Sequence, residues 1–121
     1  MENVSNAVKL ESIKSFQSTI RKTENALAQM TEKGANTTLV KKRLNALYIG
    51  LAVLEHAWNQ KPHLYTKEDL AVARNVLIGL FPSIRNIYNK SKAGSPQKTL
   101  LERRIKSLEF AVQAIDDLAN K

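Results

Sequence analysis

The chain has 121 residues, of which 43% are hydrophobic, 25% carry a charge and none is Cys. This length fits one domain, and the hydrophobic share is large enough for a core, which excludes wholesale disorder. The missing Cys excludes disulfides and thiolate metal sites, while 19 Lys and Arg against 11 Asp and Glu leave a net charge of +8.

The first predicted helix covers about residues 5–33. Ile13, Ile20 and Leu27 repeat every seven residues and form an apolar stripe along one face. Gly34 follows, and it can adopt the left-handed conformation that often ends a helix. The sequence therefore predicts a long amphipathic helix that ends before Gly34.

The second predicted helix covers about residues 38–58. Its apolar residues follow one another at steps of four and three: Val40, Leu44, Leu47, Leu51, Leu54 and Trp58. This spacing is typical of a coiled-coil seam. Tyr48, Ile49 and Val53 lie off the seam, so the helix is apolar on more than one face. It is either the most buried helix or part of an oligomer contact.

The third predicted helix begins after Thr66, a good N-cap that precedes Glu68 and Asp69 in the first turn. Its apolar face consists of Leu70, Ala73, Leu77, Leu80, Ile84 and Ile87. Pro82 lacks an amide donor and clashes with the preceding turn. We therefore expect a kink or break between Gly79 and Pro82.

The fourth predicted helix begins at Ser95 and Pro96, which suit the cap and the first helical position. It repeats the steps of four and three almost to the end of the chain: Leu101, Ile105, Leu108, Val112, Ile115 and Ala119. Together the four segments predict an all-α fold.

Four amphipathic helices with short connections favour an antiparallel, up-down-up-down four-helix bundle as a single domain over residues 1–121, with the third helix kinked near Pro82. The alternative is a three-helix fold with an extra hairpin, in which Pro82 redirects the chain. The residues expected in the core are Leu47, Leu51, Leu54, Leu108, Val112 and Ile115.

The excess positive charge gathers at one end of such a bundle, where the first and third helices end and the second and fourth begin. We take as candidate anion- or partner-binding residues Lys41, Lys42, Arg43, Lys90, Lys92, Lys98, Arg103 and Arg104. Exposed amides at two helix starts would add to this anion-binding potential. The partner would be an acidic protein surface, a nucleic acid or an anionic lipid. A surface that serves solubility alone is the other interpretation.

No set of residues predicts catalysis, because nucleophile, base and orienting group do not occur in a recognisable arrangement. His56 and His63 are the only histidines, and their spacing matches no familiar zinc site. We therefore expect no enzyme activity, no metal and no cofactor. No helix-turn-helix, zinc finger or RNA-binding aromatic signature is present either.

Two stretches carry a resemblance to a known family. They are Lys61-Pro62-His63-Leu64-Tyr65-Thr66-Lys67-Glu68, which leads into a long helix, and Phe110-Ala111-Val112-Gln113-Ala114-Ile115-Asp116. In them the chain resembles the YppE-like family, small uncharacterised helical-bundle proteins of Gram-positive bacteria. The first helix does not match, and residues 92–98 form an extended loop by comparison. The resemblance implies a helical bundle in a bacterial cytoplasm and brings no activity.

The sequence thus predicts a small cytoplasmic binding or regulatory module, monomeric or homodimeric, that uses its basic end. The first twenty residues include Glu2, Lys9, Glu11 and Lys14, which leaves no signal-peptide core. The longest apolar run, residues 48–54, is too short to span a bilayer. One alternative is a nucleic-acid-associated factor that contacts phosphates. Another is similarity to bacteriocin-immunity proteins, basic helical bundles that act at the inner face of the membrane.

Overall fold

The computed structural model describes residues 4–120 and consists of four α-helices joined by short loops. The helices are α1 (Asn6–Glu32), α2 (Thr38–Asn59), α3 (Lys67–Lys90) and α4 (Pro96–Ala119). No strand occurs within the described range. The predicted all-α four-helix fold is confirmed, and the predicted helix limits lie within one or two residues of the observed ones.

The boundary signals at Gly34, Thr66 and Ser95 act as helix caps, and Ser5 caps α1 in the same way. The hydroxyls of Ser5 and Ser95 each accept a backbone N–H three residues further on, at 3.2 and 3.1 Å. Thr66 and Asp69 form a reciprocal capping box, with bonds of 3.1 and 3.0 Å. Gly34 has a φ of 71°, the left-handed conformation that ends α1.

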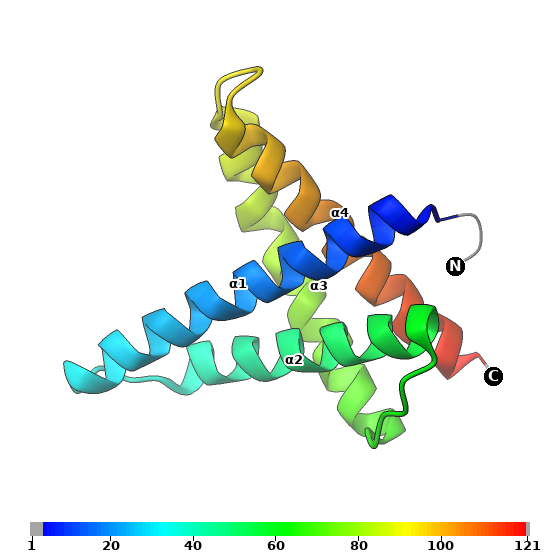
Figure 1. Ribbon diagram of the computed structural model, residues 1–121. Helices are drawn as coiled ribbons and strands as arrows, with labels where there is room; N and C mark the ends of the chain where they lie inside the picture. The colour runs from blue at the N-terminus through cyan, green and yellow to red at the C-terminus, as the bar shows by residue number, and fades with distance from the viewer. Residues whose placement is uncertain (1–3, 121) are drawn as a thin grey trace.

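The helices form two antiparallel hairpins that cross each other, as Figure 1 shows. One hairpin is α1 with α2, and the other is α3 with α4. α2 and α4 each pack against all three other helices, whereas the backbones of α1 and α3 do not approach each other within residues 4–120. The hairpins cross at a wide angle, so their turns, residues 33–37 and 91–95, point in different directions (Figure 1).

The core lies where the two hairpins cross. A Cβ atom on Gly50 of α2 would lie 3.0 Å from Cζ of Phe16 and 3.3 Å from Cδ1 of Leu77. Phe16 of α1 and Leu77 of α3 therefore pack over this glycine. Other small residues are buried on three helices: Ala46, Ala73, Ala111 and Ala114. Small side chains at a crossing allow the helix axes to come close together.

Four of the six predicted core residues are fully buried: Leu47, Leu54, Leu108 and Ile115. Leu51 and Val112 are only partly buried and pack against the edge of the core, which corrects their assignment. Ile49 and Val53, which lie off the predicted seam, are buried as well. The reason is that α2 contacts three helices and needs more than one apolar face. α2 has more buried residues than any other helix, which agrees with its interpretation as the most buried helix.

α3 continues through Pro82 as one helix, so this proline does not redirect the chain and the three-helix alternative is wrong. Pro82 is exposed, and an added Cβ on the nearby Gly79 would meet no atom within 4 Å. The missing amide and the bulky ring therefore lie away from the core. The kink itself stays a prediction.

Polar contacts on the surface also join the helices. Arg74 of α3 contacts both carboxylate oxygens of Asp116 of α4, at 2.5 and 3.4 Å, and this hydrogen bonding raises the pKa of the guanidinium. The Tyr48 hydroxyl of α2 donates to the carboxylate of Glu24 in α1, which raises the pKa of Tyr48. Between residues 4 and 120, no helix combines the length and hydropathy that a membrane span requires.

Candidate anion-binding surface

The wide crossing angle divides the predicted basic residues among three places. Lys41, Lys42 and Arg43 lie in the first turns of α2, at what we call the α1–α2 tip (residues 33–43). Lys90, Lys92 and Lys98 lie where α3 ends and α4 begins, at what we call the α3–α4 tip (residues 90–98). Figure 1 shows these tips at the ends of two separate arms. They therefore do not form the single basic end that nearly parallel helices would give.

The α1–α2 tip presents free cations to solvent. Lys41, Lys42 and Arg43 are exposed, and none of them forms an ion pair with another residue of the described chain. They also lie at the positive end of the α2 dipole, where cations are unfavourable. No acidic residue occupies the first turn of α2 to offset them.

At the α3–α4 tip one lysine contacts an aromatic ring. Lys98 is partly buried, and its Nζ lies 4.5 Å from the centre of the Tyr88 ring, within the range of a cation–π contact. Lys90 and Lys92 are exposed. This tip therefore has two free lysines and one that an aromatic ring holds in place.

Arg103 and Arg104 belong to neither tip. They lie further along α4 and line a cleft of about 170 Å³ between α4 and α1. We call it the α1–α4 cleft, and its residues are Glu11, Lys14, Ser15, Ser18, Lys22, Leu100, Arg103 and Arg104. Four of these side chains are basic and one is acidic, so the cleft has an excess of positive charge.

The single acidic residue of the α1–α4 cleft is already paired. Nε of Arg103 lies 2.6 Å from Oε1 of Glu11, and about half of each side chain is exposed. An exposed pair of this kind contributes only about 0–1 kcal/mol to stability. Its effect on the cleft is to hold Arg103 against α1 and to leave the other cations without a counter-ion.

Arg104 is the unusual residue of the cleft. Its Nε is buried and has no hydrogen-bond partner, and desolvation lowers the pKa of its guanidinium. No carboxylate of residues 4–120 pairs with it. Because this nitrogen is covered by protein atoms while Arg104 as a whole is only partly buried, a ligand in the cleft would contact the exposed part of the guanidinium.

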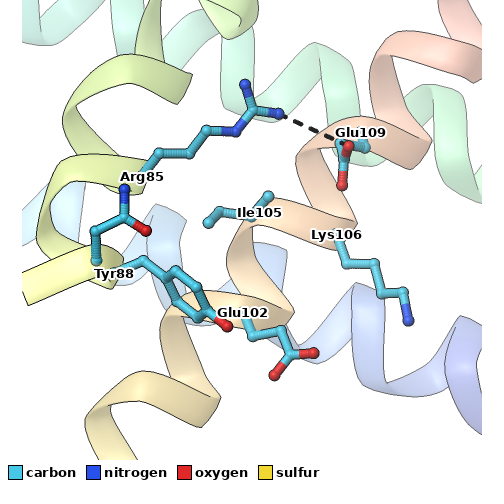
Figure 2. A pocket seen from close by; sticks show the side chains of 7 residues that line it. Arg85, Tyr88, Glu102, Ile105, Lys106 and Glu109 are labelled. Carbon is cyan, nitrogen blue, oxygen red and sulfur yellow. Dashed lines mark ion pairs between the residues drawn. The ribbon is translucent and has the colours of Figure 1, made fainter. Parts of the chain in front are cut away.

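A second and larger hollow lies between α3 and α4 (Figure 2). It measures about 420 Å³ and is lined by Arg85, Tyr88, Asn89, Glu102, Ile105, Lys106 and Glu109. Arg85 lies 3.8 Å from Glu109 in an ion pair, and Figure 2 shows Lys106 extending away from Arg85 and Tyr88. Two basic and two acidic side chains balance here, so this hollow has no preference for anions.

The histidines have structural partners. Nδ1 of His56 donates to the carbonyl of Lys61 at 2.8 Å, and the rings of His56 and His63 meet edge to face at 4.8 Å. The His63 ring stacks on Tyr65, 6.2 Å away. These contacts shape the loop between α2 and α3. Within residues 4–120, no three His, Asp or Glu side chains gather closely enough to hold a metal ion.

Comparison with known proteins gives no relative: no family model, no curated protein and no solved structure matches this chain. The resemblance to the YppE-like family therefore stays a hypothesis that rests on the two stretches of sequence.

Sequence reasoning missed the contribution of α1 to the cleft. Lys14, Ser18 and Lys22 are spaced four residues apart, which places them on one face of a helix. That signal was available. What the sequence did not indicate is that this face lies beside Arg103 and Arg104, because that depends on how the two hairpins cross.

Proposed function

We propose that this protein is a non-enzymatic binding module that recognises an acidic partner. Its binding surface, which we call the basic surface, comprises the α1–α2 tip, the α1–α4 cleft and the α3–α4 tip. The observation that carries the proposal is the α1–α4 cleft, where four basic side chains face one acidic side chain that is already paired. Solubility requires charge on the surface, but it does not require four cations from two helices around one small cleft.

A nucleic acid is the acidic partner that this distribution of charge favours. The cations are spread over two arms and the region between them (Figure 1). A long polymer with regularly spaced phosphates can contact all three places, whereas a compact acidic patch would contact only one. Most of the side chains are lysines, which attract phosphates as point charges without reading a base sequence. We therefore propose binding with little sequence preference.

The test is a titration of the protein with duplex DNA, RNA and heparin at two salt concentrations. The affinity should fall with salt, and five to eight phosphate contacts would give a log–log slope of roughly −4 to −7 on duplex DNA. The variant Lys41→Glu/Lys42→Glu should bind much more weakly.

The matched control is Lys61→Glu/Lys67→Glu, which changes the net charge by the same amount near the turn between α2 and α3. If both variants lose affinity equally, net charge and not the basic surface determines binding, and the proposed surface is wrong. If the unaltered protein binds none of the three polyanions at low salt, recognition of a polyanion is wrong.

A further inference from the structure

The α1–α4 cleft differs from the tips because four cations from two helices line one small space. Lys14 and Lys22 reach it from α1, while Arg103 and Arg104 reach it from α4. The cleft measures about 170 Å³. Pockets for drug-sized ligands measure roughly 300–1,000 Å³, so this space suits a compact group.

The donors that line the cleft match those of a phosphate site. A guanidinium presents its N–H groups in a planar fork that fits two phosphate oxygens at once. Arg104 is available for this contact, because it is only partly buried and forms no ion pair with another residue of 4–120, and Glu11 is already paired with Arg103. The hydroxyls of Ser15 and Ser18 line the same space and can donate to further oxygens.

We propose that the α1–α4 cleft binds the phosphate group of a phosphate monoester, with Arg104 as its main ligand. Lys14 and Lys22 supply charge to balance a dianion, and Arg103 is held beside it by Glu11. The inference rests on the proposed function in that the cleft is part of the basic surface. It assigns to the cleft a ligand that needs several cations around one space. Lys42 of the α1–α2 tip also lines a hollow, of about 230 Å³, but the other residues that line that hollow are uncharged.

Two sources can present this group, a free metabolite or a lipid headgroup. The probes are therefore glycerol 3-phosphate in solution and vesicles that contain phosphatidic acid, each measured by calorimetric titration at constant ionic strength. Vesicles of phosphatidylglycerol, which carries a phosphate diester, serve as the comparison. We expect saturable binding to the monoester in one or both forms. The form that binds identifies the source, and binding to neither overturns the proposal.

The decisive variant is Arg104→Met, which keeps most of the side-chain length and removes the guanidinium. Circular dichroism should show an unchanged helix content, and affinity for the monoester should fall roughly tenfold or more. Arg104→Lys keeps the positive charge without the planar fork of N–H groups. Its affinity for the monoester should lie between that of the unaltered protein and that of Arg104→Met. If Arg104→Met binds the monoester as tightly as the unaltered protein, the cleft is not the site.

The tip variant Lys41→Glu/Lys42→Glu separates this inference from the proposed function. It should retain binding to the monoester while it loses affinity for DNA. Monoester binding without DNA binding would refute only the polyanion proposal. DNA binding without monoester binding would refute only the role of the cleft.

Discussion

The two ends of α2 show how differently the crossing and the arms are built. From Leu44 to Trp58, where α2 lies between the other helices, most of its apolar side chains are buried. From Thr38 to Arg43, at the α1–α2 tip, five of six residues are exposed, three of them cations. Within residues 4–120 no charged side chain is fully buried. In α2, apolar burial is thus concentrated in the crossing and positive charge in the arm, so the charge of the arm can be altered without removing core contacts.

The largest effect is expected from truncating a core residue at the crossing. Leu54 is completely buried, and Leu54→Ala should lower the free energy of unfolding by about 2–5 kcal/mol, since it removes apolar contacts and leaves a cavity. Urea denaturation followed by the fluorescence of Trp58, the single tryptophan, measures this directly. Leu39→Ala is the matched control on the same helix, because Leu39 is 59% exposed in the arm. Equal losses of unfolding free energy at Leu54 and Leu39 would refute the distinction between the crossing and the arm.

An intermediate effect is expected from adding bulk to the crossing. Gly50→Val places new atoms against Phe16 and Leu77, where even a Cβ lies as close as 3.0 Å to its neighbour. Overpacking of this kind costs about 1–3 kcal/mol. Gly79→Val is the control, since an added Cβ there meets nothing within 4 Å. Thermal unfolding of the two variants should differ clearly, and an unaltered midpoint for Gly50→Val would show that the crossing is loosely packed.

The smallest effect is expected in the arms. Lys41→Gln/Lys42→Gln removes two cations from the positive end of the α2 dipole and should stabilise the protein by about 0.3–1 kcal/mol at low salt. Lys90→Gln should instead destabilise the protein, because Lys90 lies in the last turn of α3, where a cation is favourable. Urea denaturation at low and high salt measures both changes. Effects that persist in high salt would contradict an origin in the helix dipoles, which salt screens.

Much of the fold could be predicted because local signals dominate it. Gly34, Thr66 and Ser95 act through hydrogen bonds to neighbouring residues, or through their own backbone conformation. Such signals depend on a few consecutive residues and are readable in one sequence. The apolar spacing of α2 and α4 likewise indicates which faces are buried, without reference to the rest of the molecule.

The crossing angle could not be predicted in the same way. Apolar residues at steps of three and four are compatible with nearly parallel helices and with strongly inclined ones, and the side chains at the contact decide between them. Here Gly50 and the buried alanines form that contact. The single basic end that the sequence predicts requires a small crossing angle. The cleft around Arg104 was missed for the same reason, since its other wall comes from α1.

The cleft also joins the two helices that lie furthest apart along the chain. Each hairpin closes between helices that are neighbours in sequence, whereas the wall of α1 at Lys14 and that of α4 at Arg104 can meet only after the whole chain has been brought together. Contacts that close the longest loops carry the largest entropic cost, and we expect them to form late in folding. A ligand in the cleft would then leave the folding rate nearly unchanged and act by slowing unfolding.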